Sequence, residues 1–278
     1  MSLSVFVVVL AAALLHAIWN SIVKNGEDKL KSTALLALTT CILTAFALPF
    51  IELPHSQSWF YLGVSIVLQV VYYLLVALNY KLSDLSLSYP LMRGTAPVLV
   101  ALVGVCLLDE SLSMWGWLGI FLIALGIVSM AWSARKAAGT AGIILALLNA
   151  TVIAAYTLVD GLGVRHAGSA ISYAVWLFFL STIPIVIWAL AYHKQAFIVY
   201  SCTHWVSGSI AGLGSSLAYA MVLWAMLHAP IALVAALRET SIVFATLFAA
   251  WMLKEKISMS RFFAVVLIAL GAVALRLA

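Results

Sequence analysis

Long apolar runs separated by short polar connections dominate the pattern along this chain. Each run is close to the length of about 20 residues that a helix needs to cross a membrane. The pattern predicts ten such helices, over residues 3–23, 32–51, 59–80, 86–107, 114–133, 140–160, 170–192, 205–227, 231–253 and 259–277. The period-two alternation typical of a membrane β-barrel is absent from the sequence. The first run lacks a basic leader and a cleavage site, so we expect it to be retained.

The composition agrees with a membrane protein. Of the 278 residues, 66% are hydrophobic and only 8% are charged, whereas a soluble domain is about half apolar and about a quarter charged. An ordinary soluble protein, a disordered tail and a nucleic-acid binder are therefore excluded. We predict an all-α integral membrane protein whose single transmembrane domain covers residues 1–278.

The basic residues are distributed unevenly between the two sides of this predicted bundle. One side carries Lys24, Lys29, Lys31, Lys81, Arg135, Lys136, Lys194, Lys254, Lys256 and Arg261. The other side carries only Arg165 and Arg276. Since cytoplasmic loops are enriched in lysine and arginine, we expect both termini on the non-cytoplasmic side of the inner (cytoplasmic) membrane.

The sequence also repeats itself at an offset of 145 residues. Arg93 aligns with Arg238, and the pentapeptide Leu-Ile-Ala-Leu-Gly at residues 122–126 recurs at 267–271. The repeats would cover about residues 1–135 and 138–278, with five helices each. An odd number of helices places the second repeat upside down relative to the first. Inverted repeats of this kind are common in secondary transporters, which bind substrate between the halves.

The motifs of each half resemble a known family. Residues 89–97 read Tyr-Pro-Leu-Met-Arg-Gly-Thr-Ala-Pro and lead to Leu-Asp-Glu-Ser-Leu-Ser at 108–113, while Leu-Arg-Glu-Thr-Ser at 237–241 leads to Leu-Lys-Glu-Lys-Ile-Ser at 253–258. Over its whole length the chain resembles the EamA family of the drug/metabolite transporter superfamily. The resemblance implies a permease for small organic metabolites, often an exporter, that works by alternating access. Its arginine motifs also resemble a subgroup associated with phosphonate utilisation.

Three charged residues lie well away from the ends of the predicted spans, at a depth where a charge is costly and usually faces a cavity or a partner. They are Arg93, Arg238 and Glu239. One interpretation is that the arginines bind an anionic group in a forked contact, while Glu239 receives a substrate amine or a coupling proton. The other is an internal ion pair that only stabilises the bundle.

Further polar and aromatic residues are candidates for the same substrate site. Tyr89 lies one turn before Arg93, and His16, Trp19 and Asn20 lie close together on the first span. Deeper tyrosines that could form an aromatic wall are Tyr72, Tyr156 and Tyr219. Each of them has a purely structural alternative as packing or as an interface anchor. His16 and Glu239 together motivate a hypothesis of proton coupling.

Other expectations are negative or structural. The sequence has no nucleotide-binding loop, no marked nucleophile–base pair and no cluster of metal ligands, so we expect no enzyme activity, no catalytic residue and no cofactor or metal. An intramembrane enzyme or a channel remains an alternative class, and export of lipophilic or cationic compounds is the alternative transport function. We expect a monomer, with Asp160 at a water-facing helix end and Glu110 and Glu255 capping helices. The glycines Gly208 and Gly212 predict a close helix–helix contact.

Overall fold

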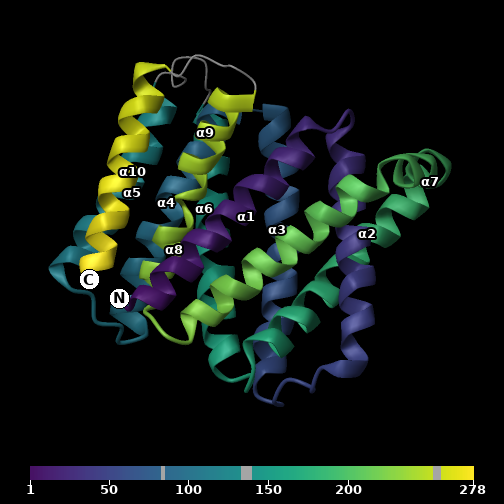
Figure 1. The fold of residues 1–278 in the computed structure, drawn as a ribbon, viewed down its shortest axis with the longest axis horizontal. Coiled ribbons are helices and arrows are strands. Elements are labelled where there is room, and N and C mark those ends of the chain that lie inside the picture. The colour runs from purple at the N-terminus through teal and green to yellow at the C-terminus, as the bar shows by residue number, and fades with distance from the viewer. Residues whose placement is uncertain (83–84, 133–139, 253–257) are drawn as a thin grey trace.

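The computed structural model describes residues 1–82, 85–132, 140–252 and 258–278, and within these ranges every regular element is a helix. The elements are α1 (Leu3–Asn25), α2 (Lys29–Ala47), the short 3₁₀ helix η1 (Leu48–Phe50), α3 (Ser58–Leu82), α4 (Leu85–Leu107), α5 (Met114–Trp132), α6 (Thr140–Arg165), α7 (Ala170–Met226), α8 (Ile231–Arg238), α9 (Ser241–Met252) and α10 (Met259–Leu277). Figure 1 shows them as one bundle. The predicted all-α class is confirmed.

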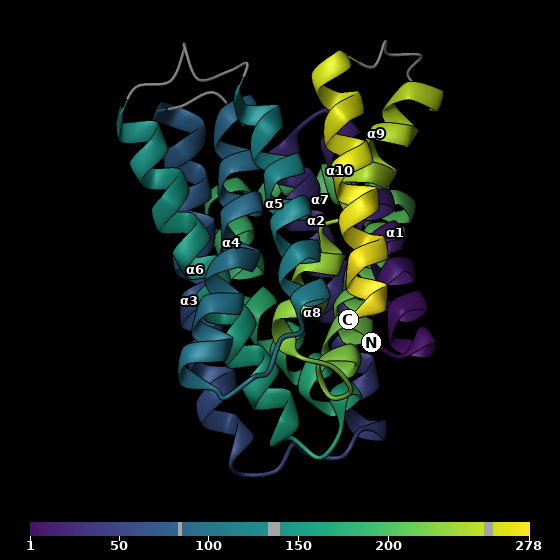
Figure 2. The same cartoon turned by 90° about the vertical axis from the view of Figure 1, so that its left-hand side faces the viewer.

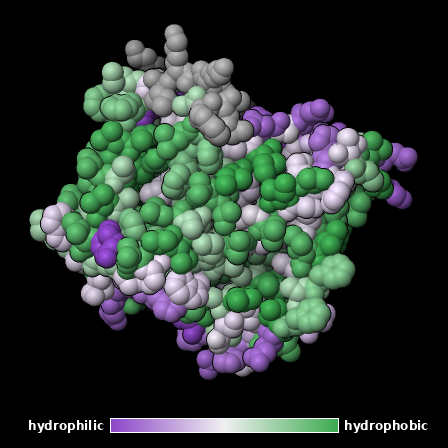
Figure 3. Space-filling view, viewed as in Figure 1, coloured by the Kyte–Doolittle hydropathy of each residue, from purple (hydrophilic) through white to green (hydrophobic). Residues whose placement is uncertain are grey.

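The surface of the bundle is that of a membrane protein. In the part of the chain that the structure describes, eight helical segments are long and apolar enough to cross a membrane, and Met114–Met130 forms a shorter apolar helix. Large apolar side chains face outward, with Phe46 at 76% and Met114 at 85% exposure. Figure 3 shows apolar residues across the middle of one face and hydrophilic ones gathered mainly toward its edges. Lipid, not water, is the solvent that such a surface requires.

Two predicted spans differ in detail from the helices observed. The expected connection between residues 192 and 205 is itself helical, so α7 continues through it and doubles back in Figure 1, with non-helical backbone at His193 and His204. The expected span 231–253 is instead interrupted after Arg238, and α9 begins at Ser241. The interruption falls at the charged residues, a feature that hydropathy alone does not reveal.

Helices α5 and α10 lie side by side at the edge of the bundle and run in opposite directions (Figure 1). A Cβ atom added to Gly271 would lie 2.8 Å from the carbonyl oxygen of Gly119, and one added to Gly126 would lie 2.9 Å from that of Ala264. The offset of 145 residues converts the first contact into the second, because it relates Gly126 to Gly271 and Gly119 to Ala264. The backbones approach this closely only because glycine has no side chain there.

The predicted small-residue contact of α7 is confirmed. Thr39 of α2 donates a hydrogen bond to the carbonyl oxygen of Gly208 (2.8 Å), and Thr40 donates one to that of Gly212 (3.4 Å). Glycine at these two positions of α7 therefore brings α2 close enough for side chains to bond to the neighbouring backbone.

All eight residues of α8 are buried, which places this helix and its last residue, Arg238, in the interior of the bundle.

The two chain ends lie near each other in Figure 2, and Arg276 donates a 2.7 Å hydrogen bond to the carbonyl oxygen of Met1. Both termini therefore lie at the same end of the bundle.

Candidate functional site

Two arginines and one carboxylate meet in the interior of the bundle. Arg93 is on α4, between Pro90 and Pro97, and its Nε lies 2.8 Å from Oε2 of Glu239. Nε of Arg238 lies 3.9 Å from Oε1 of the same carboxylate. Arg93 and Arg238 are each 6% exposed and Glu239 is 2% exposed. The three charged residues predicted from the sequence thus form one cluster, which we call the arginine pair with Glu239.

The local backbone explains how Glu239 reaches this position. At the interruption between α8 and α9, the amide of Glu239 donates to the carbonyl of Ala236, and that of Thr240 donates to the carbonyl of Leu237. Two further i→i−3 bonds follow, from the amides of Ile242 and Val243 to the carbonyls of Glu239 and Thr240, so tight turns replace the regular helical ladder here. The interruption turns the carboxylate toward α4, so that Glu239 pairs with Arg93 as well as with its sequence neighbour.

Several N–H groups of the two arginines have no hydrogen-bond acceptor among the described residues. Among the described residues, Nη2 of Arg93 and Nε of Arg238 are buried and have no hydrogen-bond acceptor. Nε of Arg93 contacts Glu239 as an ion pair, but its N–H is not aligned as a hydrogen bond. Buried donors without an acceptor cost about 1–3 kcal/mol each, and more when they are charged. The cluster therefore has buried donors left for a further hydrogen-bond acceptor.

Aromatic side chains surround the two guanidinium groups. Tyr72 of α3 and Tyr156 of α6 meet edge to face, with ring centroids 6.0 Å apart. Both of them, together with Tyr89, interact electrostatically with Arg93. The ring of Tyr219 lies 6.0 Å from Cζ of Arg238. Four of the tyrosines that the sequence nominated therefore lie around the arginine pair.

Of the three candidate residues on α1, His16 is connected to this cluster directly and Trp19 through its contact with His16. His16 interacts with both arginines and packs edge to face on Trp19, with ring centroids 4.8 Å apart. The indole Nε1 of Trp19 is buried and has no hydrogen-bond partner among the described residues. Asn20 is half-buried, and no hydrogen bond joins its side chain to another described residue.

One buried acid was not predicted. Asp160 was expected at a water-facing helix end, and this expectation is wrong: α6 continues to Arg165, and Asp160 is fully buried. Its carboxylate accepts hydrogen bonds from Tyr173 (3.0 Å) and from Tyr219. The one sequence signal for it is its position one helical turn after Tyr156, which puts the two residues on one face. A hydropathy window ends at the first charge and therefore missed it.

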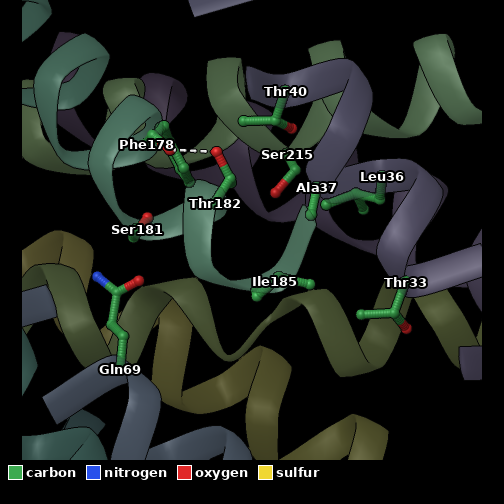
Figure 4. Close-up of a pocket in the computed structure, with 10 residues that line it drawn as sticks. All are labelled: Thr33, Leu36, Ala37, Thr40, Gln69, Phe178, Ser181, Thr182, Ile185 and Ser215. Atoms are coloured by element: carbon green, nitrogen blue, oxygen red, sulfur yellow. Dashed lines mark hydrogen bonds between the residues drawn. The ribbon is translucent and has the colours of Figure 1, made fainter. Parts of the chain in front are cut away.

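A small hollow of about 40 Å³ lies between α2, α3 and α7. Figure 4 shows the side chains that line it, of which the polar ones are Thr33, Thr40, Gln69, Ser181, Thr182 and Ser215. None of the residues nominated from the sequence lines it. The hollow is nevertheless linked to the cluster, because Phe178 in its wall packs on Tyr219, with ring centroids 5.7 Å apart.

A second ion pair lies near one end of the bundle. Oε1 of Glu110 lies 3.0 Å from Nη2 of Arg165 and accepts a 2.9 Å hydrogen bond from the amide of Ile231. Arg165 also donates to the carbonyl oxygens of Met226 (3.2 Å) and Ala229 (3.5 Å). Glu110 was expected to cap a helix, and it does cap α8, although not the helix that follows it. We call this group the Glu110–Arg165 latch; its counterpart Glu255 lies outside the described residues.

Comparison with known proteins decides the family. The model of the EamA-like transporter family matches the chain twice, over residues 3–132 and 140–277. The chain belongs to the EamA-like transporter family. It is therefore a multi-pass membrane transporter of the drug/metabolite type, and the two matches correspond to two halves that each carry one arginine of the pair.

Solved structures agree with the fold of an EamA-like transporter. One, titled only as the crystal structure of a protein, superposes with a TM-score of 0.77 at 16% identity, over 100% of this chain and 98% of that chain. At this identity the likeness supports the fold alone. No curated protein matches the chain. In the described part of the chain, no three histidine, cysteine or acidic side chains gather as a metal site would require.

Proposed function

We propose that this EamA-like protein is a secondary transporter of small anionic or zwitterionic metabolites, such as amino acids or aminophosphonates, and that the arginine pair with Glu239 binds them. The observation that carries the proposal is the convergence of two buried arginines on one carboxylate, with donors left over. A guanidinium group binds a carboxylate or a phosphonate through parallel hydrogen bonds. An anion from the substrate would supply the acceptors that Arg93 and Arg238 lack.

The surroundings of the pair also suit a substrate amine. Oε2 of Glu239 contacts Nε of Arg93 as an ion pair, but it accepts no aligned hydrogen bond from a described residue. Tyr72 and Tyr156 present ring faces and edges nearby, and aromatic rings attract ammonium groups. A zwitterion would thus place its anionic end on the arginines and its amine between Glu239 and the tyrosines. If the arginines did not bind the substrate, these tyrosine rings would favour lipophilic cations, which is the alternative function.

The architecture that we propose is ten crossings in two inverted five-helix halves. In this arrangement α7 supplies two crossings, and α8 with α9 supplies one interrupted crossing. The exchanged contacts of Gly119 with Gly271 and of Gly126 with Ala264 support the inversion. A two-fold axis that relates two antiparallel helices by exchanging equivalent residues lies perpendicular to those helices, hence in the membrane plane.

Alternating access requires one side of the site to be closed while the other is open. The Glu110–Arg165 latch joins the two halves, since Glu110 belongs to the first and Arg165 and Ile231 belong to the second. We propose that the latch closes the non-cytoplasmic side. The polar hollow reaches Thr33, near the start of α2 and close to Lys29 and Lys31, so it would serve as the cytoplasmic entrance. Export is the direction we propose, by analogy with the family.

A thermal-shift screen on purified protein in detergent tests the substrate class. The panel contains amino acids, aminophosphonates, simple carboxylates, sugars and lipophilic cations, with Arg93→Ala and Arg238→Ala run alongside. We expect stabilisation by an anionic or zwitterionic ligand that is lost in an arginine variant of normal unliganded stability. Stabilisation only by cations, unchanged in both variants, would make the arginines structural and would favour the alternative.

A further inference from the structure

Asp160 is a buried acid that the proposed substrate contacts do not use. It lies on α6, its exposure is 0%, and its two oxygens accept hydrogen bonds from different tyrosines of α7, Tyr173 and Tyr219. No positively charged atom lies within ion-pair distance of it among the described residues. Asp160 therefore differs from Glu239, which two arginines hold.

The charged and titratable groups that face Asp160 come from several helices. Tyr173 and Tyr219 approach from α7, and Arg238 of α8 interacts with the carboxylate electrostatically without contacting it. From α3 the neighbour is the hydroxyl of Ser65, which carries no charge. The charge on α4, Arg93, is paired with Glu239. On α6 itself Arg165 is occupied by the latch.

The two tyrosines can hold the carboxyl group in either charge state. A phenol donates to a carboxylate, and after the carboxyl takes up a proton the same phenol oxygen can accept from it. An ionised carboxylate without a cation in contact is the costly state in a buried, low-dielectric site. Neutralisation by a proton is the least expensive way to relieve that cost, and the geometry here leaves the hydrogen bonds intact.

The charges of the interior give this proton a role. Arg93, Arg238, Glu239 and ionised Asp160 sum to zero, so the ligand-free cluster is balanced. A net anion on the arginine pair would leave one uncompensated negative charge in the interior, which is unfavourable. We propose that Asp160 takes up a proton from water when a net anionic substrate binds the arginine pair. This inference rests on the proposed function for its substrate, whereas protonation of Asp160 can be tested without any ligand.

The linkage has a consequence for transport. A proton that binds together with an anion crosses the membrane with it. Each exported anion would then take a proton out of the cell, against the usual inward proton gradient. The concentration gradient of the metabolite itself would therefore have to drive its export. A zwitterion adds no net charge to the cluster and requires no proton.

Infrared titration of the ligand-free protein tests the protonation. A carbonyl stretch of a protonated carboxyl group should appear above the range near pH ~4 in which exposed carboxyl groups titrate; this band should be lost in Asp160→Asn and should remain in the matched variant Glu239→Gln. If Asp160→Asn does not fold, Tyr219→Phe replaces it, and removal of one donor to the carboxylate should move the midpoint of the band to higher pH. A band that survives in Asp160→Asn, or a midpoint unmoved in Tyr219→Phe, would overturn the assignment to Asp160.

The linkage is tested at fixed pH with two probes that keep their charge near neutrality. Ethanesulfonate is a net anion, and 2-aminoethanesulfonate is a zwitterion of similar size. We expect ethanesulfonate to increase the carbonyl band of Asp160 and the zwitterion to leave it unchanged. Binding of ethanesulfonate, seen by thermal shift, without an increase in the band would overturn the linkage. Failure of both probes and of the whole screen to bind would instead count against the proposed function.

Discussion

Nε of Arg93 lies 2.8 Å from Oε2 of Glu239, and these two residues belong to different matches of the family model. An ion pair in this position joins the two halves of the transporter in the interior of the bundle. Among the described ion pairs, it is the only one whose carboxylate also lies near a second arginine, Arg238. Several expectations follow from how these charges are shared.

Glu239→Gln should destabilise the ligand-free protein. Removal of one partner of a buried pair costs about 3–5 kcal/mol, because the remaining charge is left uncompensated. The double variant Arg93→Met/Glu239→Gln removes charge of both signs and should recover part of that loss. Thermal unfolding in detergent measures both. Equal stability of Glu239→Gln and the parent protein would indicate that Glu239 does not compensate the arginines.

Arg93→Lys and Arg238→Lys separate charge from geometry. Lysine keeps the positive charge but not the planar fork, so each variant should lose roughly one strong hydrogen bond to the anion, about 1.5–3 kcal/mol. That corresponds to at least a tenfold weaker affinity. Isothermal titration with the best anionic ligand of the screen measures it. Affinities unchanged in both lysine variants would mean that charge alone, without a forked contact, accounts for binding.

Glu110→Gln should loosen the Glu110–Arg165 latch. The amide can still accept from Ile231, but it no longer neutralises Arg165, so the end of the bundle should open more often. Labelling of a cysteine at Met226, a buried residue beside Arg165, should become faster with a membrane-impermeant thiol reagent. The background lacks Cys41, Cys106 and Cys202. An unchanged labelling rate would argue that the latch does not gate access.

Gly126→Val and Gly271→Val should both disrupt the contact between α5 and α10. An added side chain would meet a carbonyl oxygen of the opposite helix at under 3 Å in each case, and overpacking typically costs about 1–3 kcal/mol. Since the repeat relates the two positions, the losses in thermal stability should be similar. Leu118→Val, at a side chain 40% exposed on α5, is the control. A loss in one glycine variant only would contradict the exchanged contacts.

Much of this molecule is predictable from its sequence, because hydrophobicity specifies membrane spans well. The span limits agree with α1 to α5 within a few residues, and the three charged residues singled out from the sequence lie together in the structure. The repeat made that possible: its offset relates Arg93 to Arg238, and a site between inverted halves brings equivalent positions together. The small-residue contact of Gly208 and Gly212 was likewise readable from spacing.

The rest depends on tertiary contacts that spacing does not encode. Asp160 looked like a helix end because a window of hydropathy cannot distinguish an acid in water from an acid bonded to Tyr173 and Tyr219. The interruption at Glu239 arises from two tight turns, not from proline or glycine. Asn20 shares a helix face with His16, for which an electrostatic interaction with both arginines is indicated, but this spacing alone does not place Asn20 at the cluster. Sequence periodicity assigns faces, whereas depth and partner are decided by packing.

Transport by the purified protein tests most directly whether the arginine pair with Glu239 binds the substrate. Proteoliposomes preloaded with the best anionic or zwitterionic ligand of the screen are diluted into the labelled compound, and exchange is followed with time. We expect saturable exchange that is lost in Arg93→Ala/Arg238→Ala and retained in Leu118→Val. Undiminished exchange in the double arginine variant would contradict it and would place the substrate elsewhere in the bundle.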